Sequence, residues 1–335
     1  MRAWVVTGAN KGIGLEIATG MVTAGCYVFL CSRDVSRGEA AVKTLVGVNP
    51  SAASLVEVIQ LDVTDDASVA AAVAKVSRRC SGGKLMGLVN NAGGGTSMSY
   101  TSHEDNAYTV GINFTAVSKV TAAFLPLITL AAGRIVMVGS GAAPSFVAKC
   151  KPECQRVFVD PNVTMEMIQS LVEQQAQISA SETADPAQAF EAAGFGDGGS
   201  YGFSKALLNC LTVVLARENP SLKINACSPG FIETDLTRPF AVKMGKSCAE
   251  MGMLPASEGA VAPLFLALQK NLPTPAGNGW YYGSDAKRSP LHKYREPGTP
   301  EYDGSLPEYE PLTEPEAEVE AATEPEAAPE PEAEA

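Results

Sequence analysis

The chain has 335 residues and a formal net charge of −12, but this charge is not spread evenly along it. With two histidines, His103 and His292, the composition argues against a catalytic or structural metal and against a Ser/His/Asp hydrolase. The eight cysteines include one close pair, Cys150 and Cys154, whose spacing is poor for zinc. They are typical of reduced thiols in a cytosolic protein.

The last 40 residues differ in composition from the rest. From Glu296 onward there are 14 acidic residues, 8 prolines and no Lys or Arg. Such a segment cannot bury enough apolar surface to offset the entropy of ordering it, so we expect residues 296–335 to be disordered. The chain has 37 acidic residues in all, so residues 1–295 hold 25 basic and 23 acidic side chains. The tail either solvates the protein or docks on a basic partner or on the protein's own basic cleft.

Seven apolar segments alternate with helical stretches along residues 1–295. Strands are expected near 3–7, 27–31, 56–61, 86–90, 134–139, 223–227 and 279–283. This alternation predicts a single α/β domain built on a Rossmann-type doubly wound parallel sheet. The longest charge-free apolar stretch, 120–133, is too short to span a bilayer, and Met1 leaves no room for a signal peptide before the first strand. We therefore expect a cytoplasmic protein with no membrane or nucleic-acid partner.

A glycine-rich turn lies between the first strand and the first helix. Its residues are Gly8, Asn10, Lys11, Gly12, Ile13 and Gly14. Glycines let the backbone turn tightly and approach a pyrophosphate, and the unpaired amides at the start of the following helix favour an anion. The spacing is Gly-x-x-x-Gly-x-Gly, which differs from the common Gly-x-Gly-x-x-Gly. A purely structural role for these glycines stays open.

The residues after the second strand bear on the type of cofactor. A dinucleotide-binding fold places there an acidic side chain for the ribose 2′-hydroxyl, but Ser32 and Arg33 follow the strand here. A guanidinium at Arg33, with Lys11 in the turn, would bind a 2′-phosphate that a carboxylate would repel. This pattern favours NADP(H) over NAD(H). Asp34 is the exception, because the preference weakens if Asp34 faces the ribose.

Polar and small residues follow the later strands as well. Asp62 and Val63 follow the third strand, Asn90, Ala92 and Gly93 end the fourth, and Pro229, Gly230, Ile232 and Thr234 follow the sixth. Because the carboxyl ends of parallel strands meet at one edge of the sheet, we expect these residues to line the cofactor cleft. Asp62 either caps a turn or accepts a hydrogen bond from the adenine amino group.

Tyr201 and Lys205 are four residues apart on a predicted helix, so their side chains lie on one face. A free tyrosine has a pKa of about 10. An ammonium ~4 Å away, at an effective dielectric constant of about 20, attracts the phenolate by about 4 kcal/mol and would lower this pKa by roughly three units. Tyr201 could then exchange a proton near pH 7. Ser140, at the end of the fifth strand, and Asn113, at the start of a long apolar helix, accompany this pair.

In this order, the glycine turn, the strand ends and the Tyr-x-x-x-Lys pair resemble the short-chain dehydrogenase/reductase family over residues 1 to about 290. Three segments are most similar to the monomeric NADPH-dependent carbonyl reductases of that family: Thr7–Gly14, Arg33–Gly38 and Asn225–Gly230. The resemblance implies NADP(H) as the cofactor and a small carbonyl compound as the substrate.

The resemblance also implies a catalytic set of Asn113, Ser140, Tyr201 and Lys205, in which Tyr201 and Lys205 contact the cofactor as well. Tyr201 would protonate the carbonyl oxygen as hydride reaches the carbon, while Ser140 would hold that oxygen by a hydrogen bond. Lys205 would lower the pKa of Tyr201 and bind the nicotinamide ribose, and Asn113 would position a water in a proton relay. One departure is that glycines flank Ser140 where the family often has a second serine before it, which predicts a flexible surrounding for Ser140.

An insertion, residues 141–199, separates Ser140 from Tyr201, where the wider family has a short loop. Asp160-Pro161 is expected to open a helix in this insertion. An apolar stripe then follows, formed by Met167, Ile168, Leu171 and Val172. The carbonyl reductases resembled here carry a similar insertion over a surface that relatives use for oligomerisation, so the resemblance implies a monomer. A mobile lid over residues 173–199 is the alternative.

The function that the resemblance implies is NADPH-dependent reduction of ketone, aldehyde or quinone carbonyls to alcohols. The alternatives are an alcohol dehydrogenase of the same fold and a non-enzymatic NADP(H) sensor with a partner-binding tail. The substrate site would combine Ser140 and Tyr201 with Phe231. The loop after Thr234 brings several methionines, which either form an adaptable apolar wall or pack between helices: Met244, Met251 and Met253.

Overall fold

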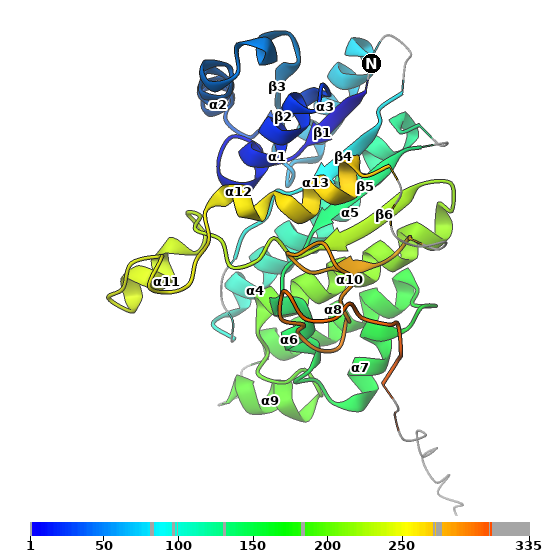
Figure 1. The fold of residues 1–335 in the computed structure, drawn as a ribbon. Helices are drawn as coiled ribbons and strands as arrows, with labels where there is room; N and C mark the ends of the chain where they lie inside the picture. The colour runs from blue at the N-terminus through cyan, green and yellow to red at the C-terminus, as the bar shows by residue number, and fades with distance from the viewer. Residues whose placement is uncertain are drawn as a thin grey trace, which may run out of the picture.

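Seven parallel strands form one sheet at the centre of the molecule, in the order β3-β2-β1-β4-β5-β6-β7 (Figure 1). The strands are β1 (Ala3–Val6), β2 (Tyr27–Ser32), β3 (Val56–Gln60), β4 (Gly87–Asn90), β5 (Arg134–Val138), β6 (Lys223–Cys227) and β7 (Tyr281–Tyr282). The strand order reverses between β1 and β4, which confirms the predicted doubly wound sheet. The computed structural model describes residues 2–80, 84–95, 98, 100–129, 132–181, 185–270, 272, 277–307 and 309.

Alternation along the strands divides the core into two layers. In β1, Ala3 and Val5 face one layer, while Trp4 and Val6 face the other. The layer on the Trp4 side contains α1 (Gly12–Thr23), α2 (Val35–Val48), α12 (Ala256–Gly259) and α13 (Val261–Leu268). The opposite layer contains α3 (Asp66–Arg79), α4 (His103–Val110), α5 (Ala116–Phe124) and α10 (Ser200–Glu218). Helices on both faces bury every central strand, which is why these strands are almost continuously apolar.

The insertion before α10 forms a cap that packs on α10 and α4. Its helices are α6 (Ala142–Val147), α7 (Pro152–Val159), α8 (Met165–Ala180) and α9 (Pro186–Ala192). Phe203 of α10 meets the rings of Phe146, Phe158 and Phe195 edge to face, with ring centroids 5.7–6.3 Å apart. Such aromatic contacts stabilise a packed interface. The cap is therefore built into the core over its described residues, whereas residues 182–184 of the predicted lid lie outside them.

The helix with the apolar stripe begins later than predicted. Asp160 ends α7, and its carboxylate accepts a hydrogen bond from the Asn162 amide at 2.7 Å instead of opening a helix. Thr164 caps α8 by accepting from the Met167 amide at 3.3 Å. The predicted stripe is confirmed: Ile168 and Leu171 are buried, and Met167 and Val172 pack against them at its edges.

One continuous helix among the described residues, His103–Leu127, is long and apolar enough by length and composition to cross a membrane. It comprises α4, a π-helical turn (Gly111–Thr115), α5 and a 3-10 turn (Leu125–Leu127). Within the fold it packs against α3, α8 and α10. A second 3-10 turn covers Pro50–Ser54, and the short helix α11 (Arg238–Lys243) stands away from the body on a loop (Figure 1).

The chain after β7 folds back along the edge of the sheet and lies beside α10 (orange to red in Figure 1). Ser289 donates its amide to the Tyr281 carbonyl at 2.8 Å, and Arg288 forms an antiparallel bridge with Tyr282. Glu301 accepts from the Arg288 amide at 3.1 Å. The predicted boundary of the disordered tail at 296 is therefore too early, because residues up to 307 lie on the body; the rest of the predicted tail, apart from residue 309, lies outside the described residues.

Two truncations separate these parts of the C-terminus. Deletion of 296–335 removes the Glu301 bond and the contact of Tyr302 with the Arg288 guanidinium, 5.3 Å from the ring centroid. Net losses of about 1 kcal/mol per hydrogen bond predict a fall in Tm of roughly 5 °C. Deletion of 310–335 should shift Tm by no more than about 1 °C, because this Glu/Pro/Ala-rich segment has little apolar surface to contribute. Scanning calorimetry of both variants beside the full chain checks this, and equal Tm values for all three would contradict it.

Candidate active site

The glycine turn is shaped for an anion at the start of α1. Gly8 and Gly12 have φ angles of 62° and 53°, a region that favours glycine. A Cβ at Gly14 would lie 2.4 Å from the Asn91 Nδ2, so only glycine lets α1 approach the end of β4. Lys11 is the N-cap of α1, and among the described residues no side chain caps this helix. The first amides of α1 are therefore available to a pyrophosphate.

Residues at the end of β4 contact the glycine turn, but not entirely as predicted. Asn90 is 2 % exposed, and its Nδ2 donates to the Thr121 Oγ1 at 2.8 Å, so its side chain points into the core rather than into the cleft. Asn91, which the sequence did not single out, donates to the carbonyls of Thr7 and Gly8 at 2.9 and 3.1 Å. Ala92 lies against the turn, where a Cβ at Gly8 would come within 2.9 Å of its Cα. If Asn90 contacts the cofactor as predicted, it does so through its main chain.

The carboxylate of Asp34 is engaged by the helix that follows it. Asp34 is the N-cap of α2 and accepts from the Arg37 amide at 3.1 Å. Arg33 beside it is exposed. Asp62 accepts from the Thr64 amide and hydroxyl at 3.0 and 2.7 Å, and these bonds, with a smaller contribution from the Arg33 charge, lower the pKa of Asp62. Asp62 thus caps its own turn, one of the two predicted roles, and the half-buried Val63 follows it.

Lys11 takes a partner that the sequence did not suggest. Its ammonium forms an ion pair with Asp235, which also binds the Arg238 guanidinium at 2.6 Å. The loop after Thr234 crosses the glycine turn here, since a Cβ at Gly12 would lie 3.6 Å from the Thr234 Cγ2. In this structure Lys11 is therefore neutralised, whereas the prediction left it open for a phosphate.

Tyr201 and Lys205 lie on the first turns of α10, where they were predicted. Lys205 is 5 % exposed, and its Nζ donates to the Val138 carbonyl at 3.0 Å. The same Nζ lies 5.9 Å from the centroid of the Tyr201 ring. The Tyr201 hydroxyl forms a hydrogen bond with Ser140. Helix α10 thus brings a phenol and an ammonium to the end of β5.

Ser140 is held firmly, contrary to the flexible surrounding that its flanking glycines predict. The Gly139 amide donates to the Cys227 carbonyl at 2.7 Å, and the Gly141 amide donates to the Ser228 Oγ at 3.1 Å. The Ser140 Oγ itself accepts from the Ala142 amide at 3.1 Å. Backbone hydrogen bonds on both sides therefore fix the hydroxyl that faces Tyr201.

Asn113 is fully buried in the π-helical turn between α4 and α5. Its side chain makes a reciprocal pair with Gly94, donating to the carbonyl at 2.7 Å and accepting from the amide at 3.1 Å. The Nδ2 also donates to the Ser204 Oγ of α10 at 3.1 Å. Because protein atoms occupy the side-chain amide, a water could be bound only by the main chain of Asn113. The proton-relay water stays a prediction.

Gly93 connects Asn113 with the lysine. A Cβ at this position would lie 2.8 Å from the Asn113 Oδ1 and 3.5 Å from the Lys205 Nζ. The structure therefore brings together all four predicted catalytic residues at the carboxyl ends of β4 and β5. π-helical turns of this kind are frequent at functional sites.

Burial controls the protonation of this site. Burial raises the pKa of Tyr201, and the hydrogen bond with Ser140 opposes the rise. The net direction is opposite to the predicted lowering by Lys205. The reason is the burial of the phenol itself. Lys205 is buried too, and burial lowers the pKa of Lys205 to about 8, so its charge is itself destabilised.

The loop after β6 closes the site on the opposite side. Ser228, missed by the sequence reasoning, accepts from the amides of both Gly141 and Gly230 at 3.1 Å and so ties this loop to Ser140. Gly230 has a φ of 94°, which permits the turn that Pro229 begins. A hydroxyl directly after a strand and before Pro-Gly is the signal that could have identified Ser228.

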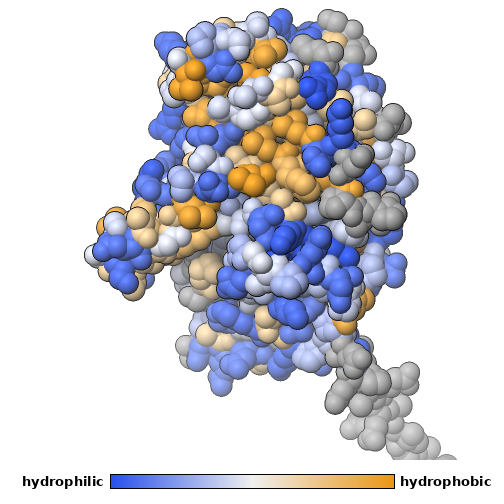
Figure 2. All heavy atoms as spheres, viewed as in Figure 1, coloured by the Kyte–Doolittle hydropathy of each residue, from blue (hydrophilic) through white to orange (hydrophobic). Residues whose placement is uncertain are grey.

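Beyond this loop the chain makes an excursion that carries α11. Ile232 is buried and bridges Leu254, and together they close the base of the excursion. Phe231 is 43 % exposed, and Figure 2 shows apolar side chains exposed on the excursion and around α13. Met253 is buried, as packing predicts, whereas Met244 is 60 % exposed, and its part in an apolar wall of the substrate site stays a prediction.

Comparison with known proteins agrees with this geometry. Residues 2–150 match the family model of the short chain dehydrogenases. The chain is 31 % identical over 297 residues to (+)-neomenthol dehydrogenase of Arabidopsis thaliana, covering 82 % of this chain and 93 % of that one. It is 32 % identical over 279 residues to carbonyl reductase [NADPH] 1 of Sus scrofa, covering 80 % and 87 %. The chain belongs to the short-chain dehydrogenase/reductase family.

A solved structure supports the same assignment. Salutaridine reductase of Papaver somniferum superimposes with a TM-score of 0.69 at 27 % identity, covering 84 % of this chain and 99 % of that one. As a short-chain dehydrogenase/reductase, the protein is an oxidoreductase that acts on carbonyl or alcohol groups and uses a nicotinamide cofactor.

The depressed pKa of Lys205 predicts a pH dependence of stability. Between pH 8 and about 10.5 the unfolded chain binds a proton at this lysine that the folded chain has released, so this lysine makes stability rise with pH in that window. Relative to Lys205→Met, the cofactor-free wild type should gain about 2 kcal/mol between pH 8 and pH 9.5. Urea denaturation of both proteins at the two pH values measures the difference. A difference that is the same at both pH values would show that Lys205 is not desolvated.

Proposed function

We propose that the protein reduces ketone, aldehyde or quinone carbonyls to alcohols with NADPH, and that Tyr201 is the proton donor. The observation that carries this proposal is the hydrogen bond between Tyr201 and Ser140 with Lys205 on the next turn of α10. A carbonyl oxygen that replaced the bond between the two hydroxyls would accept a hydrogen bond from each. The site thus offers two donors to one oxygen and a cation nearby.

The protonation state of Tyr201 supports the reducing direction. Because burial raises the pKa of Tyr201, the phenol holds its proton at neutral pH, which is the form that reduction requires. When bound, the nicotinamide supplies a hydride to the carbonyl carbon. Tyr201 gives its proton to the developing alkoxide, Ser140 holds that oxygen, and the Lys205 ammonium stabilises the phenolate that remains. Oxidation of alcohols by the same groups is the reverse reaction, for which the phenol must first lose its proton.

The preference for the phosphorylated cofactor rests on Arg33. Asp34 accepts a hydrogen bond at the start of α2, and the guanidinium of Arg33 beside it is exposed. A guanidinium binds a 2′-phosphate with two hydrogen bonds, which NADH cannot offer. The relative named carbonyl reductase [NADPH] 1 supports the same choice. Lys11 would also bind the 2′-phosphate if it exchanged its ion pair with Asp235 for one with the phosphate.

Removal of the Tyr201 hydroxyl tests the proposed reaction. Tyr201→Phe should lower kcat for carbonyl reduction by about 10²–10⁴-fold, because the proton donor is lost, while NADPH binding is retained. Tyr27→Phe is the matched control, since its hydroxyl binds Glu57 at 2.9 Å at the other end of β2. NADPH oxidation with a panel of ketones, aldehydes and quinones, together with NADPH fluorescence titration, gives both values. Unchanged turnover in Tyr201→Phe would remove it as the donor.

A charge reversal tests the cofactor preference. Arg33→Asp should weaken NADPH binding by at least about 30-fold and NADH binding only slightly, because repulsion acts on the 2′-phosphate alone. Lys43→Asp, on the exposed side of α2, makes the same change in net charge and should affect neither cofactor. Dissociation constants from fluorescence titration decide the matter. Equal losses for both cofactors would place Arg33 away from the ribose.

A further inference from the structure

The segment 284–307 is anchored by an ion pair that is largely buried. The Arg295 guanidinium, 7 % exposed, pairs with the Asp285 carboxylate and donates to the Ser289 Oγ at 2.9 Å and to the Thr299 carbonyl at 3.0 Å. The second Asp285 oxygen accepts from the Gly298 amide at 2.9 Å. A buried ion pair persists when hydrogen bonds satisfy the remaining donors and acceptors, as here. The backbone on both sides of Arg295 is therefore held in place.

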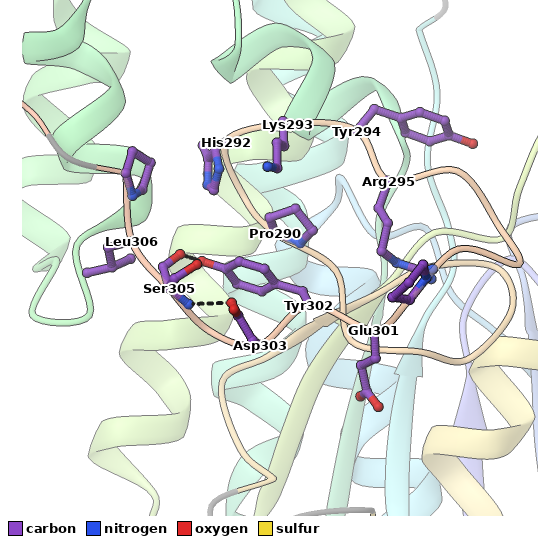
Figure 3. A pocket seen from close by; sticks show the side chains of 12 residues that line it. Pro290, His292, Lys293, Tyr294, Arg295, Glu301, Tyr302, Asp303, Ser305 and Leu306 are labelled. Atoms are coloured by element: carbon purple, nitrogen blue, oxygen red, sulfur yellow. Dashed lines mark hydrogen bonds between the residues drawn. The ribbon is translucent and has the colours of Figure 1, made fainter.

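Tyr294 and Arg295 point in different directions from this anchor. Tyr294 helps to line a cavity of about 460 Å³ together with Pro290 and Tyr302, but Figure 3 shows its ring extending away from the other side chains of that cavity, while Arg295 is directed into the segment. The segment itself forms this cavity, since all of its lining residues fall between 290 and 307. Tyr294 therefore faces another part of the molecule.

That part is the backbone next to the catalytic serine. A Cβ at Gly141 would lie 2.7 Å from the Tyr294 Cε2 and 3.1 Å from its Cδ2, so the ring rests on Gly141. Gly141 follows Ser140 directly and is fixed by its bond to Ser228. Tyr294 remains 45 % exposed, as expected for a side chain at the mouth of a site.

Tyr281 lies on the other side of the catalytic serine, since a Cβ at Gly139 would lie 3.7 Å from the Tyr281 Cε2. Burial raises the pKa of Tyr281. A hydrogen bond with Ser228 opposes this rise, and the phenols of Tyr294 and Tyr201 add to it.

We propose that Tyr294 is a specificity-determining residue that forms the wall of the substrate site beside Ser140. The proposal rests on carbonyl reduction at Ser140 and Tyr201 and names the substrate class: carbonyl compounds with planar or small substituents. An aromatic ring fixed by its backbone offers a flat surface on which aryl or quinone groups stack, and it collides with branched aliphatic groups. Gly141 matches this ring, because any larger residue would displace it.

The test compares phenyl carbonyl compounds whose second substituent is hydrogen, methyl, isopropyl or tert-butyl. In the wild type, kcat/KM should fall steeply along this series. Tyr294→Ala should raise the ratio of the tert-butyl ketone to benzaldehyde at least about 10-fold, whereas Tyr294→Phe keeps the ring and the wild-type ratio. Lys293→Ala, an exposed neighbour, is the control and should leave the ratio unchanged.

A double-mutant cycle tests the contact with Gly141. Gly141→Ala should lower kcat/KM for benzaldehyde, because the ring is pushed aside. The fold-loss that Gly141→Ala causes should be at least about 5 times smaller in the Tyr294→Ala background than in the wild type. Additive losses would show that the two residues do not interact. Tm and NADPH affinity of each variant confirm that folding and cofactor binding are intact.

The outcomes separate this proposal from the proposed reaction. If the wild type reduces benzaldehyde and Tyr294→Ala leaves the substituent ratio unchanged, Tyr294 does not line the site. If no carbonyl compound is reduced by any variant, the proposed reaction fails. The same substituent series measured by ligand-observed NMR binding then tests Tyr294 alone: a loss of wild-type size selectivity in Tyr294→Ala supports it, and unchanged selectivity overturns it.

Discussion

The carboxyl end of β4 holds the two halves of the site in register. Asn91 donates hydrogen bonds to the backbone of the glycine turn at Thr7 and Gly8. Three residues later, Gly94 exchanges two hydrogen bonds with the Asn113 side chain. Asn113 also reaches Ser204 on the catalytic helix. A short path of hydrogen bonds thus connects the turn that would bind the pyrophosphate with the helix that carries Tyr201. The strand order reverses here, and a sheet of this kind binds its ligand at the carboxyl ends of the strands beside such a reversal.

The parts of this site that could be predicted are those set by position along the chain. Gly14, Ser140 and Lys205 each follow a strand or begin a helix, and parallel strands bring such positions to one edge of a sheet whatever the details. Contacts between distant segments could not be predicted in this way. The direction of the Asn90 side chain depends on Thr121, and the partner of Lys11 is a residue more than 220 positions away. Neither contact could be predicted, because the local sequence carries no information on it.

The C-terminal segment shows why composition misplaced the boundary of the tail. A run rich in acidic residues and proline reads as disordered when its apolar content is the criterion. Segment 284–307 is held instead by polar contacts around one buried cation, and Arg295 lies just before the point where the composition changes. Carboxylate, hydroxyl and carbonyl oxygens surround its guanidinium, so burial needs few apolar neighbours. Such a segment can only be recognised once its partners are known.

The cap explains how the site can be so deeply buried. Burial of Lys205 destabilises the fold, because its ammonium loses contact with water. The opposite face of α10 offsets this through apolar packing, in which Phe203, Leu207 and Leu211 are each at most 1 % exposed. The inserted helices α6, α7 and α8 supply much of the surface against which this face packs. The insertion therefore does more than cover a surface: it lets a single helix carry a buried ammonium on one side because its other side is buried in an aromatic core.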